Sequence, residues 1–258
     1  MVRNDLPDRN MPVTRAHVDA AKETIILERR SHIDSLIARL REPRIIRILG
    51  PMLAGERTSA QDVLHEDFAY AIGLGLLQLK EGQYQIPNAI YREVIPRALT
   101  FDQQTQINAS SAKYVLGGGG LDMASLMRAW QSFWRKDGHL AADGFGYREA
   151  GPHLMLMAFL QRIVNGGGRI EREYGLGRGA LDLMVFWKDE RHLIEVKLRR
   201  DTETEADALD QVAEYLEHAG LPEGWLVLFD LRKERTWAEK LTVRDVEHAG
   251  KVVHVVGC

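Results

Sequence analysis

Two carboxylates and a lysine interrupt the apolar runs of GALDLMVFWKDERHLIEVKL, residues 179–198. Asp182 lies in the first run, while Glu195 and Lys197 alternate with apolar residues in the second. Both runs have the composition of β-strands, and the charged stretch between them predicts a hairpin turn. Because alternate residues of a strand share a face, Glu195 and Lys197 point to one side of the sheet, and Asp182 can lie across from them.

This arrangement predicts a metal site with a hydrolytic function. Two buried carboxylates side by side repel each other and lose hydration, and a divalent cation removes that cost. Mg²⁺, or Mn²⁺ in its place, could be held by Asp182 and Glu195, with the carbonyl of Val196 as a further ligand. Lys197 could orient or help to deprotonate an attacking water, or stabilise the charge that develops on a phosphate.

The elements that must hold these residues alternate between strands and helices. RIEREYG precedes the two runs, a helix is expected over about 203–219, and the strands WLVLFDL (225–231) and VVHVV (252–256) follow. A helix between two strands predicts that HLIEVKL and WLVLFDL pair in parallel through a right-handed crossover. We therefore predict an α/β domain with a mixed central sheet over residues 147–258, including the apolar helix GPHLMLMAFLQRIV.

The first hundred residues read as helices followed by a hairpin. Their apolar spacing predicts three helices, over residues 14–40, from Pro43 to Gly50-Pro51, and over about 59–73. The alternation from Leu76 to Ile86, with Gly82 in the turn, predicts a small β-hairpin. This order has the outline of a winged helix, so we expect an N-terminal helical and winged-helix domain over residues 1–100.

Residues 101–146 are expected to form a linker and a helix. FDQQTQINASSAKYVLGGGG is polar and then glycine-rich, as linkers are, and LDMASLMRAWQSFWRK has helical spacing.

The composition is that of a globular protein without a membrane segment. A formal net charge of −3 excludes a strongly basic coat but leaves room for a local basic groove, since Lys and Arg number 34. No apolar run approaches the ~18–20 residues that span a bilayer, and the N-terminus lacks the apolar core of a signal peptide. We therefore expect a cytoplasmic protein with no membrane partner. The nine histidines and single cysteine form no zinc-site spacing.

The D-x₁₂-E-x-K spacing of Asp182, Glu195 and Lys197 resembles the motif of the PD-(D/E)xK nuclease superfamily. Leu181 stands at the motif's proline position, which is variable. The resemblance covers residues 147–258 and implies the restriction-endonuclease-like fold, Mg²⁺ at the two carboxylates, and a nucleic acid substrate, DNA rather than RNA.

Flanking residues extend this resemblance. Residues 175–182 read GxGRxxxD, and Gln211 with Tyr215 forms the Q-x-x-x-Y pattern that many members carry on the next helix. Their i, i+4 spacing places both side chains on one helix face. Members often add a glutamate from the preceding helix, which the resemblance assigns to Glu149, with Glu173 as a competing candidate.

The N-terminal region carries a separate resemblance. HIDSLIARLREPRIIRILGPMLAG and GLGLLQLKEGQYQIPNAIYREVIPR are similar to the segment that follows the nucleotide-binding core in a group of prokaryotic AAA-type ATPases. In that group a winged helix leads into a nuclease-like domain. No G-x-x-x-x-G-K-[ST] motif is present, so the resemblance implies an ATPase tail without its motor, whose partner could be an ATPase core in trans.

Structural interpretations stand beside these functional ones. Asp182 and Glu195 could be structural acids paired with Arg178 and Lys197, and Glu149 could simply favour a helix N-terminus. The turn GLGRGA resembles a dinucleotide-binding loop, but a strand follows it, so that function is rejected.

Three functions therefore remain open: an active nuclease, an inert nuclease fold that binds nucleic acid or protein, and the tail fragment of an AAA-type ATPase. Gln211 and Tyr215 could equally be half-buried helix residues. Arg41, Arg44, Arg47 and Arg92 could form a basic strip on the winged helix or a solvated face. The oligomeric state is not predicted.

Overall fold

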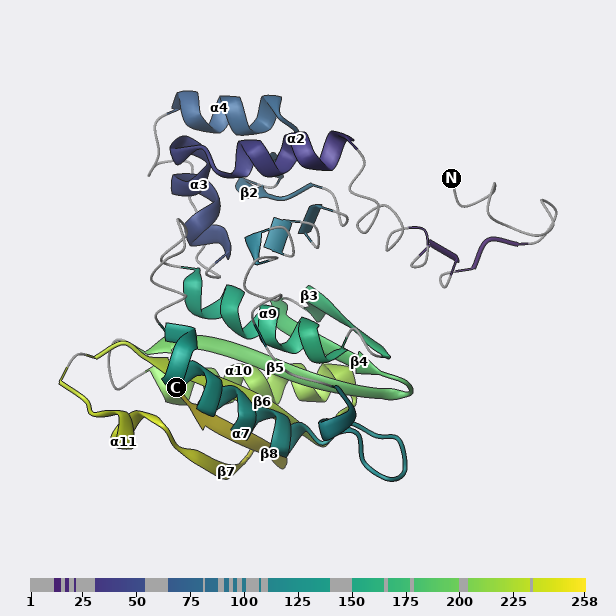
Figure 1. Cartoon of the computed structure of the whole chain (residues 1–258), viewed down its shortest axis with the longest axis vertical. Coiled ribbons are helices and arrows are strands. Elements are labelled where there is room, and N and C mark those ends of the chain that lie inside the picture. The colour runs from purple at the N-terminus through teal and green to yellow at the C-terminus, as the bar shows by residue number, and fades with distance from the viewer. Residues whose placement is uncertain are drawn as a thin grey trace. The chain divides into compact units, whose positions relative to one another are not determined.

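A computed structural model describes residues 12–14, 17–18, 21, 31–53, 65–80, 82–87, 91–92, 95–96, 99–100, 107, 111–139, 150–164, 167–176, 179–199, 204–232 and 234–258 (Figure 1). The chain divides into two compact units, residues 1–49 with 57–99 and residues 50–56 with 100–258. Among the helices in these ranges, none has both the length and the apolar character needed to cross a membrane.

The first unit contains helices and a hairpin. Its helices are α2 Ser31–Leu40, α3 Pro43–Leu53 and α4 His65–Gly73, and α3 continues into the second unit. Helix α3 starts at the predicted proline, whose fixed φ suits a first turn, and buries Ile45, Ile48 and Leu49. The prediction that it ends at Gly50-Pro51 is wrong. Pro51 lies in the last turn of α3, where the loss of one backbone hydrogen bond does not interrupt the helix.

The predicted hairpin is present. Strands β1 Gln78–Lys80 and β2 Gln83–Gln85 pair antiparallel, with Leu79 opposite Tyr84. Gly82 supplies the positive φ of +77° that the turn needs. The ring of Tyr84 stacks on that of Phe68 at 4.1 Å, which joins the hairpin to α4.

The second unit is built on a mixed six-stranded sheet, so the chain has α/β character. Its strands are β3 Gly168–Leu176, β4 Gly179–Trp187, β5 Glu190–Arg199, β6 Glu223–Asp230, β7 Val243–His248 and β8 Lys251–Gly257. The spatial order is β3-β4-β5-β6-β8-β7, with parallel pairing at β5–β6 and β6–β8 and antiparallel pairing elsewhere. The predicted parallel pairing of β5 with β6 is confirmed. Sequence periodicity missed β7, whose residues are mostly exposed.

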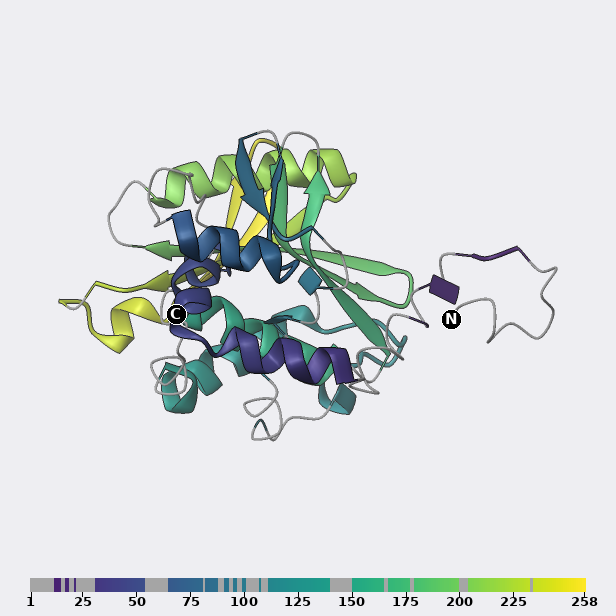
Figure 2. The ribbon, with the colours of Figure 1, turned by 90° about the horizontal axis from the view of Figure 1, so that it is seen from above.

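Helices cover both faces of this sheet. They are η2 Ser111–Tyr114, α7 Met123–Phe133, the π-helix η3 Trp134–Gly138, α9 Gly151–Val164, α10 Thr204–Ala219 and α11 Trp237–Lys240. Helix α10 forms a core with Leu193, Leu226 and Leu228. On the other face, Trp130 and Trp134 contact the ring of Phe229, which alternates with Leu228 along β6. Figure 2 shows α10 on one side of the strands and α7 with α9 on the other.

The glycine-rich stretch expected to be a linker forms a turn on the β4–β5 hairpin. The Trp187 indole donates to the carbonyl of Gly119 at 3.0 Å, and the amide of Leu121 donates to Glu190 at 2.9 Å. Gly119 has a φ of +88°, and a Cβ there would meet the side chain of Lys188. The glycines therefore permit a close approach of backbone to hairpin.

Candidate functional site

Asp182 and Glu195 lie side by side on the face of the sheet that α10 covers. The antiparallel register of β4 and β5 places Leu183 opposite Ile194, so the next residue of each strand, Asp182 and Glu195, share the other face. The amide of Val196 donates to Asp182 Oδ2 at 2.9 Å. A side chain thus takes the place of a backbone acceptor just where the β4–β5 ladder ends.

Lys197 completes the group from β5. Its Nζ lies 2.7 Å from Glu195 Oε1, and both side chains are on the α10 face. The carboxylate is 1% exposed and the lysine 29%. The neighbouring strand β6 contributes Leu226 and Leu228 beside them, since Glu195 pairs with Leu226 and Lys197 with Leu228. The three ionisable groups therefore lie at the border between an apolar core and solvent.

This environment changes the proton affinity of Glu195. Burial and the nearby Asp182 carboxylate raise the pKa of Glu195 to about 8, although Lys197 opposes the shift. Burial lowers the pKa of Lys197, but its ion pair with Glu195 has the larger combined effect, and the net pKa lies above the usual value. Lys197 is thus an ammonium at neutral pH, whereas Glu195 lacks enough positive charge nearby to hold it firmly ionised.

Gln211 and Tyr215 meet on α10 as their spacing predicts. Gln211 Nε2 donates to the Tyr215 hydroxyl at 2.8 Å. Tyr215 is buried, which raises the pKa of its phenol, and the charges of Glu195 and Lys197 also act on it. The pair therefore lies close to the carboxylate group, with Tyr215 forming part of the core that covers it.

Some predicted residues cannot be placed. Glu149, Gly177 and Arg178 lie outside the described residues, and Glu173 is in β3 but its side chain lies outside the description. The described ranges contain no group of three or more His, Cys, Asp or Glu side chains that could hold a metal.

The oxygen atoms of the described residues nevertheless match the ligands that Mg²⁺ takes. Two carboxylates converge, and the Val196 carbonyl points to the same side of β5 as its amide, which means toward Asp182. One or two carboxylates with waters and substrate phosphate are a usual Mg²⁺ set. Asp182, Glu195 and Val196 therefore fit this cation without a third acidic side chain.

Arg199 was not singled out from the sequence, although the same alternation predicts its place. It follows Lys197 by two residues on β5 and so lies on the α10 face, at the end of the strand. The alternation in Lys197-Leu198-Arg199 was the sequence signal that could have identified Arg199.

A pocket lies elsewhere in this unit. It has a volume of about 430 Å³, and Trp225 and His254 line it. The two His254 nitrogens lie 2.7 Å from Asp245 and 3.5 Å from Glu223. His254 thus lies between two carboxylates of this pocket.

Comparisons with known proteins give one family match. Residues 123–233 match the model of a family described as Domain of unknown function (DUF8371). The matched region runs from α7 to the segment after β6, so it includes Asp182, Glu195, Lys197, Gln211 and Tyr215. No curated protein and no solved structure matched the chain.

Proposed function

We propose that this chain is a Mg²⁺- or Mn²⁺-dependent nuclease of the PD-(D/E)xK type that hydrolyses phosphodiester bonds in DNA. Its second unit would be a restriction-endonuclease-like domain, and its first a winged-helix module. The observation that carries the proposal is the meeting of Asp182, Glu195 and Lys197 at one point of the sheet. Perturbed carboxyl groups of this kind concentrate at functional sites.

The charge balance favours a cation site over a structural ion pair. Lys197 is the ammonium that pairs with Glu195, while Asp182 adds a second carboxylate beside it. A buried ion pair gains little from a second like charge, because repulsion and desolvation both oppose it. A divalent cation would allow both carboxyl groups to be ionised side by side.

The described residues divide the work of such a site. Asp182, Glu195 and the Val196 carbonyl would hold Mg²⁺, which when bound supplies positive charge to the scissile phosphate and to the attacking water. Lys197 is an ammonium, so it would donate to a phosphate oxygen and stabilise charge in the transition state rather than accept a proton.

Tyr215 and Gln211 would have a supporting role. Tyr215 packs in the core beneath the carboxylates, and its hydroxyl is fixed by Gln211. Outer residues of this kind orient the groups that contact metal or substrate. Glu149 remains a proposed further ligand from the residues that precede α9.

Two of the four arginines that could form a basic strip have partners within the first unit. Arg44 bonds to Glu42 at 2.9 Å and lies over the ring of Tyr70, and Arg47 pairs with Asp67 at 2.6 Å. These arginines are already used internally. We therefore propose that DNA binds chiefly to the second unit, and that the winged-helix module contacts protein, with an ATPase core in trans as the partner.

A cleavage assay tests the nuclease. Purified full chain with Mg²⁺ or Mn²⁺ is expected to cut single- or double-stranded DNA, and EDTA is expected to prevent it. Asp182→Ala removes the activity in this proposal, while Asp189→Ala, an exposed aspartate in the turn of the same hairpin, retains it.

Two outcomes count against the proposal. If both forms of DNA stay intact with either metal, the chain is not a DNA nuclease, and salt-sensitive binding without cutting would support an inert binding module instead. Cutting that survives in Asp182→Ala, with thermal unfolding showing a folded variant, would come from another site or a contaminant.

A further inference from the structure

Strand β7 is an outer strand of the six-stranded sheet, and among the described strands it pairs with β8 alone. The amide of Gly257 in β8 donates to the carbonyl of Thr242 at 2.8 Å, so the main chain of Thr242 faces β8. Because main-chain groups alternate in direction along an antiparallel strand, those of Val243, Asp245 and Glu247 face away from the sheet. This edge of β7 therefore presents N–H and C=O groups that a further strand could pair with.

The side of β7 that faces α10 carries basic side chains with acidic partners. Arg244 bonds to Glu205, and the ring of His248 lies 2.6 Å from Asp210, both acids being on α10. Val246, between them in the strand, packs against the core that α10 forms. The ionisable groups on this side of β7 are therefore matched within the chain.

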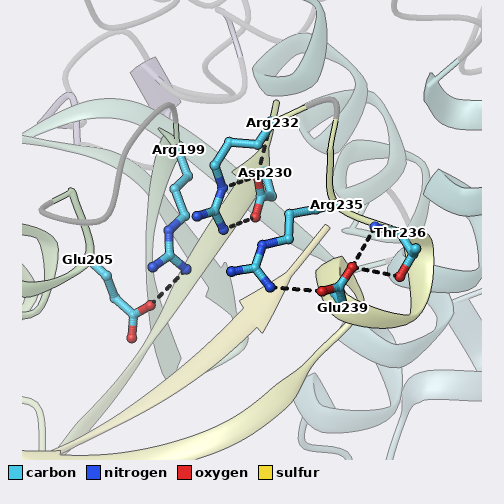
Figure 3. A network of polar contacts seen from close by, with 7 residues as sticks. All are labelled: Arg199, Glu205, Asp230, Arg232, Arg235, Thr236 and Glu239. Atoms are coloured by element: carbon cyan, nitrogen blue, oxygen red, sulfur yellow. Dashed lines mark hydrogen bonds and ion pairs between the residues drawn. The ribbon is translucent and has the colours of Figure 1, made fainter.

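The basic side chains at the ends of β5 and β6 are matched in the same way. Figure 3 shows three ion pairs there: Arg199 with Glu205, Arg232 with Asp230, and Arg235 with Glu239. Each of these guanidinium groups has a carboxylate of its own chain beside it.

The opposite side of β7, called the pocket face below, carries acids. Val243 and Asp245 line the pocket described above, and the exposed Glu247 follows at the next alternate position. Asp245 and Glu223 lie on either side of His254, and their side chains are 69% and 59% exposed. Because His254 carries at most one positive charge, these two carboxylates leave a negative charge even when it is protonated, and Glu247 adds another.

The other ionisable side chains that line the pocket do not cancel this charge. Asp122 and Arg128 on α7 are one acid and one base, and the bond from the Ser125 amide, together with the charge of Arg128, lowers the pKa of Asp122. Burial lowers the pKa of His192, so this ring is neutral at pH 7. Arg244 reaches the other side of the sheet, where it pairs with α10. The pocket face is therefore negative.

Apolar surface lies beside these acids. Leu116 and Val243 are 52% and 48% exposed, and both line the pocket. The stacked rings of Trp225 and His254, 4.4 Å apart, line it as well. The methylene stem of a lysine or an arginine packs on surface of this kind while its charged end reaches a carboxylate.

A second copy of this chain is a poor occupant of the edge. Antiparallel pairing of two β7 strands places the pocket-face residues of one opposite those of the other. Centred on Asp245 or on Val246, such pairing brings carboxylates directly opposite carboxylates, which destabilises a sheet. A strand with basic side chains at alternate positions gains a favourable cross-strand pair at each acid instead.

We propose that the edge of β7 and its pocket bind an extended segment of a partner protein that carries lysine or arginine at alternate positions. The segment adds a strand to the sheet beside Val243, Asp245 and Glu247, and its basic side chains lie on the pocket face. This interaction does not depend on the nuclease proposal, so either proposal can fail without the other.

Fluorescence anisotropy of a labelled peptide measures the binding. A capped KVKVK peptide is expected to bind the full chain with a Kd of about 1 mM or lower, and more weakly as salt rises. A capped EVEVE peptide has the same length and alternation with the opposite charge and should not bind. Glu247→Gln is expected to weaken binding of KVKVK by about 2–5-fold, and Glu247→Gln with Asp245→Asn by about 4–25-fold.

Two controls separate strand addition from simple attraction between charges. Glu214→Gln removes an exposed carboxylate from α10, on the other side of the sheet, and should leave binding unchanged. A KVKVK peptide methylated on the main-chain nitrogen of its central lysine keeps its charges but loses a ladder hydrogen bond, and should bind about 10-fold more weakly. If Asp245→Asn disturbs folding through His254, as thermal unfolding would show, Glu247→Gln decides the result.

Four results would overturn the inference. They are no binding of KVKVK, equal binding of EVEVE, an equal loss in Glu214→Gln and Glu247→Gln, and full binding of the methylated peptide, which would leave charge alone as the cause. A dimer of the unaltered chain in sedimentation that prevents peptide binding would assign the edge to a second copy and would also overturn it.

Discussion

Glu42 and Glu195 each pair with a basic side chain, but their pKa values are shifted in opposite directions. In the first unit, Glu42 accepts from Arg39 at 2.8 Å and from Arg44 at 2.9 Å, and the bond from Arg39, followed by that from Arg44, lowers its pKa to about 2. In the second unit, Glu195 lies 2.7 Å from Lys197, yet burial and Asp182 raise its pKa to about 8. A short ion pair alone therefore does not set the state of a carboxylate.

The difference lies in solvent and in the ratio of charges. Glu42 is 24% exposed and has two guanidinium groups for one carboxylate, so its ionised form is favoured. Glu195 is 1% exposed, and two carboxylates share one ammonium. The two guanidinium groups are enough to stabilise the ionised form of Glu42. Glu195 and Asp182 share one ammonium, so a divalent cation would be needed to stabilise both in their ionised form.

The largest expected difference between the two regions is in DNA cleavage. Glu195→Gln keeps the shape of the side chain but removes a proposed metal ligand, so metal-dependent cutting should fall below detection. Glu42→Gln changes the same residue type in the structural network and should cut DNA at the unaltered rate. Equal activity of the two variants in a gel-based cleavage assay would contradict the distinction drawn between them.

The next largest difference is expected between the basic residues of the two regions, in their effect on the rate of cleavage. Lys197→Gln removes the ammonium proposed to stabilise developing charge and is expected to reduce kcat by about 10²–10³-fold, as removal of such a donor does. Arg39→Gln, which removes a partner of Glu42, should leave kcat unchanged. Single-turnover kinetics at saturating Mg²⁺ provide the measurement, and a Lys197→Gln rate within about twofold of the unaltered rate would exclude the proposed role.

The tyrosines allow a milder comparison. Tyr215→Phe removes the hydroxyl that Gln211 binds and should lower activity by about 10–100-fold, the range for residues that orient a metal site. Its loss of unfolding free energy should stay near 1 kcal/mol. Tyr70→Phe removes the hydroxyl that bonds to Arg39 and Glu42 and should affect stability alone. Urea unfolding beside the cleavage assay separates the two effects.

The last comparison concerns stability as a function of pH. Without metal, Glu195 keeps its proton up to a pKa of about 8, while the unfolded chain releases it near 4.5. Between these values the folded state binds more protons, so the free energy of unfolding falls as pH rises, by at most about 1.4 kcal/mol per pH unit. For Glu42, with its lowered pKa, stabilisation is present above pH 4.5 and disappears as pH falls through about 2.

Urea unfolding in EDTA across this pH range measures both trends. The stability of the unaltered chain minus that of Glu195→Gln should decline from pH 4.5 to pH 8, and Mg²⁺ at pH 8 should stabilise the unaltered chain but not the variant. The corresponding difference for Glu42→Gln should stay level over that interval. A level difference for Glu195→Gln would show that its carboxyl group is not perturbed.

Local sequence was sufficient to predict which side chains meet where strand alternation or the i, i+4 spacing of a helix decides the geometry. The alternation of HLIEVKL placed Glu195 and Lys197 on one face, and the four-residue spacing of Gln211 and Tyr215 brought their side chains together. The hairpin at Gly82 and the parallel pairing of β5 with β6 followed from turn and connection rules. Each of these depends on neighbours close in the chain or on a general topological rule.

Elsewhere local sequence was insufficient because distant contacts outweigh local preference. Gly117–Gly120 has linker composition, yet a hydrogen bond from Trp187 holds this stretch against the β4–β5 hairpin. Strand β7 lacks a clear alternation because it is an edge strand, and its pairing with β8 defines it. Pro51 extends α3 instead of ending it.

The sequence by itself determined the order of β3 to β6 with α10 and which charged residues share a face, because periodicity is a property of the local chain. Only the tertiary structure decided that Glu195 is 1% exposed, since its burial depends on α10 and on the leucines of β6. Only the fold also joined Arg199 and Arg244 through Glu205, residues from three separate elements. Proton affinity and charge density depend on these distant neighbours, and they make the site a candidate for chemistry.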